Sequence, residues 1–541
     1  MLLFLVQIPG TLRFCIALLF PGCAERRVSR RLLAAVEQSA YLRAHPGKSL
    51  EELPLVDYRQ LEPYIARIKT GESSVLSGEP VRCLLPTSGS TGGVKLIPHT
   101  STFKTELDAA IAPWLFWTFV AHPAVAAGTS FWSLSPQPPV GKGATGEIPA
   151  GFLDDGDYLG RLGKRLLGHT LSTPAALGLL HDPEEFRHWL CLTLLCDGDL
   201  ALISIWSPTY LLVLTDYLVR RRKSLLADLG ALHRGSLPPP SPLTGTLRRP
   251  RKKRVEYLAG LLDESEQTLL RGGLVRVWPR LAIISCWADA QAEEEYRTLR
   301  ARFPGIAFQA KGLVATEGIV SIPFGPSGRL VLALASHRYR FLPLEAAPQP
   351  TSLLGPSEVE VGQEYELVLS TGNGLLNYRL GDRVAITGRL GRTPTLRFLG
   401  RRGLVSDRCG EKLDGRHVQE VFNEVLAPDD FAFLAPERED GRWRYLFFLQ
   451  AGSGRHPSLI RLAERVESGL RGNPHYALCR HNGQLGPLGV RLLGGASDAR
   501  SLVLDTLHRR GLRMGEVKLA VLFLSDGWSE ALRTAIVERE G

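Results

Sequence analysis

Apolar residues recur at three- and four-residue steps in two stretches, Ser29–Arg43 and Phe186–Cys196, and this period predicts a helix in each. Short β-rich apolar runs alternate with such stretches, at Leu202–Trp206, Leu281–Trp287 and Ile306–Phe308. Helices that alternate with apolar strands predict α/β layers in which the faces of the sheets are covered.

The pattern changes after about residue 362, where strand-like segments follow one another without helices between them. The pair Asn373-Gly374 is a strong hairpin signal between two of these segments. The expected strands are Glu364–Ser370, Leu375–Leu380, Arg383–Thr387 and Thr395–Leu399. We therefore predict a small, mainly antiparallel β unit over residues 362–399.

Beyond the turn at residues 400–403 the pattern reads helix, strand, helix, strand, helix. These elements are expected at Val418–Val425, Tyr445–Gln450, Leu459–Leu470, Gly489–Leu493 and Leu502–Arg509. The predicted fold class is α/β. A large multi-layer N-terminal domain (1–399), with α/β subdomains and the β unit, precedes a smaller, mobile α+β C-terminal domain (400–541), and a Gly- and Arg-rich hinge joins the two.

The segment Met1–Phe20 is strongly apolar, which raises the question of export or membrane anchoring. No positive region precedes it, Gln7, Pro9 and Arg13 interrupt it, and no clear cleavage site follows it. We predict an N-terminal packing helix that is broken near Pro9 and Gly10, and no stable membrane span. Contact of this helix with a membrane surface stays an open alternative.

Length and net charge limit the domain organisation and the kind of ligand that the protein can have. A chain of 541 residues is too long for one compact core. Its formal charge of +10 suits an anionic ligand, although much of the excess lies in two local clusters, Arg220–Lys223 and Arg248–Arg254. The second cluster adjoins a Pro-rich stretch, Ser236–Arg251, and no aromatic residues interleave with the charges, so a solvated loop is favoured and no nucleic-acid partner is expected.

The cysteines indicate the compartment. None of the eight has the paired C-x-x-C spacing of a structural zinc site; they lie at positions 15, 23, 83, 191, 196, 286, 409 and 479. Scattered cysteines of this kind are typical of reduced, mostly buried thiols, which favours a cytoplasmic protein.

The loop after the apolar run at Leu84-Leu85-Pro86 carries the first sign of chemistry. Its glycines let backbone N–H groups face an anion, its hydroxyls add neutral donors, and Lys95 adds a charge that can follow the β- and γ-phosphates of a nucleotide. The glycines and hydroxyls are those of Ser88, Gly89, Ser90, Thr91, Gly92 and Gly93. A Walker A loop is excluded because Leu96, and not a hydroxyl residue, follows the lysine, and the dinucleotide fingerprint also fails. Taken alone, the loop is as well explained by an ordinary Ser/Gly turn.

Three further segments gain meaning together with this loop. Thr316 and Glu317 offer a hydroxyl and a carboxylate that suit a hard cation such as magnesium, although a helix cap or a solvated acid explains them equally well. Asp382 is expected directly after a tight turn between two strands, where it can accept ribose hydroxyls or simply cap the turn. Arg401 and Lys412 flank the predicted hinge and can bind nucleotide charge or form surface ion pairs.

The four segments T-S-G-S-T-G-G-V-K, T-E-G, Y-R-L-G-D and G-R with G-E-K occur in the order of adenylate-forming ligases. More specifically, the chain resembles the Gretchen Hagen three, or auxin-responsive promoter, family of acyl-acid amido synthetases, within the firefly luciferase-like superfamily. The resemblance covers essentially the whole chain. Supporting segments are Ile203–Pro208, Val277–Pro279, Leu376–Arg379 and Cys479–Leu488.

The resemblance implies that ATP converts a small carboxylic acid to an acyl-adenylate, and that an amine, usually of an amino acid, then forms an amide. It implies ATP and Mg²⁺ as cofactors, and a monomer is favoured. The implied roles are phosphate binding by Ser88 to Gly93 with Lys95, adenylate binding by Thr316, magnesium binding by Glu317, ribose binding by Asp382, nucleotide contact by Arg401, and catalysis by Lys95, the hinge lysine Lys412 and the late lysine Lys518.

Two positions depart from the family pattern. Leu313 stands where many relatives carry an aromatic residue that stacks on adenine, and the segment Met514–Lys518 lacks the flanking residues of plant members. Trp132, Trp206 and Trp287 can line an acyl pocket or belong to the core. Two other functions remain open: transfer of the acyl group to a thiol such as coenzyme A, and a nucleotide-binding scaffold without turnover.

Overall fold

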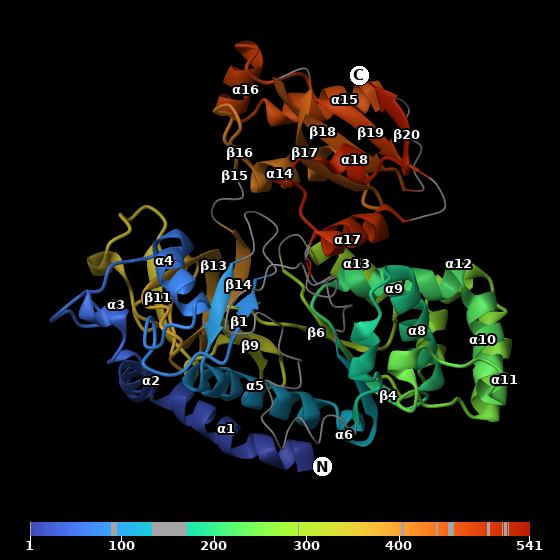
Figure 1. Ribbon diagram of the computed structural model, residues 1–541, viewed down its shortest axis with the longest axis horizontal. Helices are drawn as coiled ribbons and strands as arrows, with labels where there is room; N and C mark the ends of the chain where they lie inside the picture. Colours follow the sequence, from blue (N-terminus) through green and yellow to red (C-terminus); the bar gives the residue numbers. More distant parts are fainter. Residues whose placement is uncertain are drawn as a thin grey trace.

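The chain forms a large N-terminal domain and a smaller C-terminal domain, as the sequence predicts (Figure 1). The computed structural model describes residues 2–87, 95–132, 170–289, 292–401, 405–439, 442–452, 459–494, 498–510, 512, 517 and 519–540. The domain boundary between residues 399 and 400 stays a prediction.

A parallel sheet of four strands lies in the N-terminal domain, in the order β3-β4-β5-β6. Every pair of neighbours is parallel, which confirms the α/β layers. The strands are β3 (Thr129–Trp132), β4 (Leu200–Ser204), β5 (Ile283–Cys286) and β6 (Ala307–Ala310). The helices of this layer are α8 (Pro183–Cys196), α9 (Pro208–Arg220) and α13 (Glu293–Arg302). Helix α10 (Arg222–Arg234) packs on α8, α11 (Lys252–Leu262) packs on α10, and α12 (Glu266–Leu270) packs on α9.

An antiparallel sheet of six strands has the order β11-β12-β13-β14-β10-β9. Its strands are β9 (Ser321–Phe324), β10 (Arg329–Leu332), β11 (Arg338–Pro343), β12 (Glu364–Ser370), β13 (Tyr378–Leu390) and β14 (Thr393–Arg401). The sheet therefore includes strands that precede residue 362. The predicted hairpin joins β12 to β13, but the second strand begins at Tyr378 because Asn377 has a φ of 44° and its amide Nδ2 donates to the carbonyls of Leu50 and Leu53.

The N-terminal helix differs from the prediction. Helix α1 (Leu2–Leu19) continues through Pro9 instead of breaking there. It packs along α5 (Ser101–Ala121) (Figure 1), and Gly10 permits this approach because a Cβ at that position would lie 2.5 Å from the Cβ of Ala112. The opposite face of α1 is apolar and exposed at Leu5, Leu12, Ile16 and Leu19. In the part of the chain that the structure describes, no helix is long and apolar enough to cross a membrane.

The helix expected at Ser29–Arg43 is also divided. Helix α2 (Pro21–Val36) ends before Ser39, whose hydroxyl accepts a hydrogen bond from the N–H of Leu42 at 3.2 Å and caps α3 (Ala40–Arg43). A serine that accepts this bond favours the start of a new helix over continuation of the old one.

The C-terminal domain contains a mixed sheet with the order β17-β18-β19-β20. Its strands are β17 (Phe431–Glu439), β18 (Arg442–Gln450), β19 (Gly489–Leu493) and β20 (Ile536–Glu540). Its longer helices are α14 (Gly415–Val425), α15 (Leu459–Leu470), α16 (Pro474–His481) and α17 (Ala499–Arg509), so the five predicted elements are confirmed. Helix α17 contacts the N-terminal domain through two bonds between Arg187 of α8 and Asp505, of 2.7 and 3.0 Å.

Candidate functional site

The predicted phosphate loop lies at the tip of a hairpin. Strands β1 (Cys83–Pro86) and β2 (Leu96–His99) pair antiparallel, and the N–H of Thr87 donates to the carbonyl of Lys95 at 2.8 Å. The hairpin therefore fixes both ends of the loop, and Lys95 stands at its second end. Ser88, Gly89, Ser90, Thr91, Gly92 and Gly93 lie outside the described residues, as does Lys518.

Tyr58 links Lys95 to the segment that contains Glu317. The Nζ atom of Lys95 lies 5.6 Å from the centroid of the Tyr58 ring, and the phenol oxygen accepts a hydrogen bond from the N–H of Leu96 at 2.9 Å. Burial raises the pKa of Tyr58 above its ordinary value, and the negative charges of Glu62 and Glu317 contribute to the rise. Lys95 and Glu317 are far apart in sequence, yet both therefore act on Tyr58.

Sequence reasoning missed Tyr58, although a signal for its position exists. It is the first residue of α4 (Tyr58–Lys69), and Asp57 and Gln60 form a complete capping box around it. The sequence Asp-x-x-Gln is a recognised helix start. It predicts where the helix begins, but not that the tyrosine ring lies beside a phosphate loop.

Glu317 is the best candidate for a magnesium ligand. It lies in the two-residue turn between β7 (Val314–Ala315) and β8 (Gly318–Ile319), next to the half-buried Thr316, and is only 2% exposed. The carboxylate of Glu317 and the hydroxyl of Thr316 are hard oxygen donors, so a hard cation such as magnesium would fit the residues present.

Asp382 and Arg401 are directly opposite each other on β13 and β14. Asp382 does not follow a tight turn, contrary to the prediction. It lies inside β13, beside Gly381, whose φ of 79° accompanies a shift of register against β12. A glycine with a positive φ produces a β-bulge there, and the strand continues. Asp382 is 5% exposed, and the backbone of Arg401 ends the neighbouring strand.

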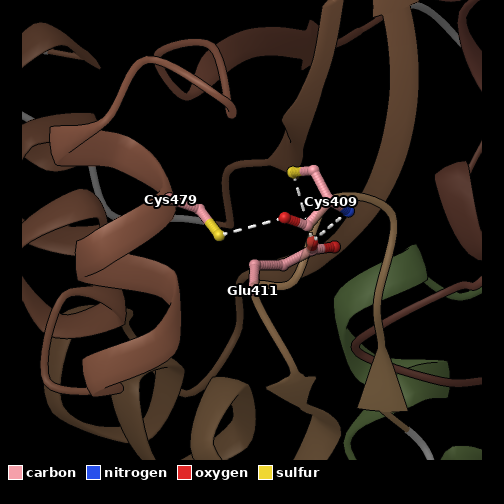
Figure 2. Close-up of side chains that lie close together, drawn as sticks. All are labelled: Cys409, Glu411 and Cys479. Atoms are coloured by element: carbon pink, nitrogen blue, oxygen red, sulfur yellow. Dashed lines mark hydrogen bonds between the residues drawn. The ribbon is translucent and has the colours of Figure 1, made fainter.

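The loop that carries Lys412 is held by its neighbour Glu411 (Figure 2). Lys412 is exposed, has a φ of 41°, and its carbonyl accepts a hydrogen bond from Asn473 at 3.0 Å. The carboxylate of Glu411 is buried and accepts hydrogen bonds from the N–H groups of Arg408 and Cys409 and, at 2.6 Å, from the hydroxyl of Tyr445. This carboxylate thereby fixes the backbone that leads into Lys412.

Two thiols stand beside Glu411, and these three groups could together hold a soft metal ion. The Sγ of Cys409 lies 3.3 Å from Oε2 of Glu411, and the Sγ of Cys479 lies 3.4 Å from the carbonyl oxygen of Cys409 (Figure 2). Burial, followed by the charge of Glu411, raises the pKa of Cys409 to about 12 and also raises the pKa of Cys479. Both groups are therefore thiols at neutral pH and pack as neutral side chains.

We expect the contribution of Glu411 to stability to depend on pH. Burial acts to raise its pKa, but the hydrogen bonds from Tyr445 and the backbone outweigh burial, so the pKa lies below the ordinary 4.5. A lowered carboxyl pKa stabilises the fold above the unfolded pKa, and this stabilisation is lost as the pH falls. The melting temperature of Glu411→Gln should lie below that of the wild type at pH 7, and the difference should shrink below pH 4.5. An equal difference at pH 7 and pH 4 would contradict this reasoning.

A pocket of about 520 Å³ lies beside the carboxyl end of β5 and the end of β14. Its lining residues are Ala288, Asp289, Glu293, Tyr296, Arg297, Arg300, Arg397, Phe398 and Leu399. The Phe398 ring packs edge-on against Trp287, with 5.4 Å between the ring centroids. Leu313, at the position where the family resemblance implies an adenine-stacking aromatic residue, is buried in the same hydrophobic core as Trp287.

Comparison with known proteins settles the family. The sequence profile of the GH3 family N-terminal domain matches residues 21–308, more than half of the chain, and that of the GH3 family central domain matches residues 330–401. The chain belongs to the GH3 family. This is the Gretchen Hagen three family that its motifs resemble.

Relatives within the GH3 family have low sequence identity to this chain, but the matches cover most of its length. A probable indole-3-acetic acid-amido synthetase, GH3.12 of Oryza sativa subsp. japonica, is 24% identical, and the match covers 87% of this chain and 86% of the relative. Indole-3-acetic acid-amido synthetase GH3.2 of Arabidopsis thaliana is also 24% identical, over 69% of this chain and 71% of the relative.

Two solved structures share the fold. The acyl acid amido synthetase AtGH3.15, in complex with 2,4-DB, superposes with a TM-score of 0.80 at 17% identity, over 98% of this chain and 97% of the other. A 2-hydroxyisobutyryl-CoA ligase in the postadenylation state, bound to 2-HIB-AMP, gives a TM-score of 0.51 at 11% identity, over 94% and 90%. The fold of this chain is therefore that of GH3 proteins and, more distantly, of an adenylate-forming ligase.

Proposed function

We propose that this chain is an ATP-dependent acyl-acid amido synthetase. A small carboxylic acid is adenylated with release of pyrophosphate, and the acyl group then passes to an amine, that of an amino acid, to give an amide and AMP. The observation that carries the proposal is the position of Lys95, 5.6 Å from the centroid of the Tyr58 ring at the end of the predicted phosphate loop, together with the buried carboxylate of Glu317. We place the cation at the end of the phosphate loop and the buried carboxylate on two sides of the triphosphate, and adenylation requires groups of both kinds. Membership of the GH3 family supports the same function.

The first half-reaction needs charge compensation at phosphorus. A carboxylate oxygen of the acid attacks the α-phosphorus, the bond to the bridging oxygen breaks, and pyrophosphate leaves. We assign the β- and γ-phosphates to Ser88 to Gly93 with Lys95, and the adenylate to Thr316. We assign the ribose hydroxyls to Asp382 and a nucleotide contact to Arg401. Mg²⁺, held by Glu317, would neutralise phosphate charge.

The second half-reaction is acyl transfer. The amine nitrogen attacks the acyl carbon, the bond from that carbon to the AMP oxygen breaks, and the amine loses a proton. Lys412 and Lys518 are proposed to contact the nucleotide one after the other, as the C-terminal domain rotates about a hinge near residue 400 between the half-reactions. Because the contact of Arg187 with Asp505 joins the two domains here, rotation must break or replace it.

The proposal is tested by measuring pyrophosphate release with a broad panel of carboxylic acids. The product is then identified by mass spectrometry with an amino-acid mixture and coenzyme A both present. Pyrophosphate release with an amide product is expected. A thioester would instead favour the coenzyme A ligase function, for which the fold similarity to the 2-hydroxyisobutyryl-CoA ligase is the supporting observation. If none of the acids in the panel gives pyrophosphate release, the alternative of a nucleotide-binding scaffold without turnover is favoured.

The surroundings of the enzyme are also part of the proposal. The eight cysteines are scattered along the chain without C-x-x-C spacing, which is typical of reduced thiols, and we propose that the enzyme acts in the cytoplasm. A monomer is proposed because one chain supplies every residue that we assign to the site.

A further inference from the structure

Two cysteines that are far apart in sequence meet beside a buried carboxylate in the C-terminal domain. Cys409 and Glu411 lie in the loop between β15 (Val405–Ser406) and β16 (Leu413–Asp414), and Cys479 lies on α16. The two sulfur atoms and one carboxylate oxygen all lie within 4.8 Å of one another, and Figure 2 shows the three side chains directed toward one another. We call these three residues the Cys-Glu-Cys cluster.

The distances within the cluster are close to those of a tetrahedral metal site. Zinc binds sulfur at about 2.3 Å and carboxylate oxygen at about 2.0–2.2 Å, so neighbouring donors around it lie roughly 3.6–3.8 Å apart. The Sγ of Cys409 is 3.3 Å from Oε2 of Glu411, and the Sγ of Cys479 lies no more than 4.8 Å from either atom. Side-chain shifts of about 1 Å or less would therefore complete the geometry.

The carboxylate of Glu411 is oriented before any metal binds. Its Oε1 accepts a hydrogen bond from the hydroxyl of Tyr445 at 2.6 Å, whereas Oε2 accepts one from the N–H of Cys409 at 2.8 Å and faces the sulfur of the same residue. The chain turns between the two ligands at Gly410, whose φ is 102°. Partners of this kind fix the direction of a ligand and strengthen metal binding.

Metal binding at this cluster adds no net charge to the buried site. In the structure, the thiol of Cys409 donates to Oε2 of Glu411, and the thiol of Cys479 donates to the carbonyl of Cys409 at 3.4 Å. A divalent cation would replace both S–H protons, which pass to the solvent, and the sulfur atoms would bind as thiolates. Two positive charges leave and two arrive, so the penalty for burying net charge does not grow.

We propose that the Cys-Glu-Cys cluster is a zinc site. Its ligands are the two sulfur atoms and Oε2 of Glu411, and water takes the fourth position. Two thiolates favour Zn²⁺ over hard cations such as Mg²⁺, and three protein ligands with one open position are a coordination that zinc adopts in proteins. Cys409 is partly exposed, which gives the ion a route to the two buried ligands, Glu411 and Cys479.

Zinc at this position would tie the loop that carries Lys412 to α16. The side chain of Asn473, which caps α16, already donates to the carbonyl of Lys412 at 3.0 Å. The ion would add a second link, through Cys479, to the segment directly before the lysine. Hydrogen exchange of the backbone amides of residues 407–412 should therefore slow when zinc binds.

The test is metal binding by the full chain, freed of metal with a chelator and kept reduced with a phosphine. Co²⁺ alone is added first, because cobalt bound to thiolates gives a sulfur-to-metal absorption band in the near ultraviolet. The wild type should show this band at a single equivalent of Co²⁺, and Zn²⁺ alone should then abolish it by displacing the cobalt. Competition with a chromophoric chelator measures the affinity for Zn²⁺.

Matched variants locate the site. Cys409→Ser and Cys479→Ser should each abolish the band and weaken zinc binding by at least about 100-fold, because loss of an outer partner alone costs about 10–100-fold. Tyr445→Phe removes only the hydroxyl that orients Glu411, so it should keep the band and weaken binding by about 10–100-fold. This variant also serves if a serine variant does not fold. Cys23→Ser removes an exposed thiol of α2 and should bind zinc like the wild type.

Absence of the thiolate band in the wild type, or a band that persists in both serine variants, would overturn the inference. Loss of zinc binding in Cys23→Ser would do the same, because the ion would then lie at α2. Neither ATP nor an acid substrate is needed for these measurements. A failure of the zinc site is therefore distinguishable from a failure of the proposed ligase function.

Discussion

Replacement of Asp382 by alanine should lower the kcat/KM for ATP in pyrophosphate exchange by about 100- to 10,000-fold. The assigned partners of this carboxylate are the two ribose hydroxyls, and each hydrogen bond to a charged group contributes about 1.5–3 kcal/mol. Two such bonds amount to roughly 3–6 kcal/mol, and about 1.4 kcal/mol corresponds to a factor of ten. Lys95→Ala should lower the same kcat/KM by a similar factor, because Lys95 is assigned to the phosphates.

Matched controls separate a role in binding from a role in folding. Asp263→Ala and Lys253→Ala remove exposed charges of the same types and should leave exchange unchanged. Asp382→Asn keeps the shape of the side chain within β13 but removes the charge, so it should fold like the wild type and still exchange poorly. If Asp382→Ala and Lys95→Ala both exchange pyrophosphate at near-normal rates, the site assignment is wrong.

The parts of the fold that follow from local sequence were predicted well. The strand expected at Glu364–Ser370 and the helix expected at Leu459–Leu470 are both observed with those bounds. In each, the spacing of apolar residues matches the face that the element buries, because burial of that face requires apolar side chains at those positions. The order of the four motifs likewise led to the GH3 family, which the match of the family profile shows.

The errors arise where distant contacts override local signals. Pro9 and Gly10 predict a break, but packing of Gly10 against Ala112 of α5 keeps the helix continuous. Gly381 reads as a turn, yet it produces a bulge because β12 and β14 pair on both sides of it. Tyr58 escaped notice for the same reason. Its surroundings come from three separate segments, namely its own helix, the start of β2 and the turn between β7 and β8, and no single stretch of sequence records such an arrangement.

The largest effect on stability is expected from Glu106→Ala. Glu106 lies on α5 and is fully buried. Its Oε2 accepts hydrogen bonds from Nδ1 of His337 at 3.0 Å and from the N–H of Gly372 at 2.9 Å, and Oε1 lies 3.7 Å from the guanidinium of Arg31. One carboxylate thereby joins α5 to the start of β11 and to the loop that leads into β13 and Asp382.

Removal of this carboxylate leaves the buried His337 and the N–H of Gly372 without their common partner, and the part-buried Arg31 loses its ion pair. Breaking a buried charged network in this way costs about 3–5 kcal/mol, so urea titration should show a drop of that size in the free energy of unfolding of the N-terminal domain. Glu106→Gln keeps one acceptor oxygen for Gly372 and should lose less, while Glu345→Ala, which removes an exposed carboxylate, should lose almost nothing. Equal losses in the alanine and glutamine variants would mean that the size of the side chain, and not its hydrogen bonds, holds this junction together.

Because the junction also positions β13, the rate of pyrophosphate exchange by Glu106→Ala should fall even at temperatures where the protein is still folded.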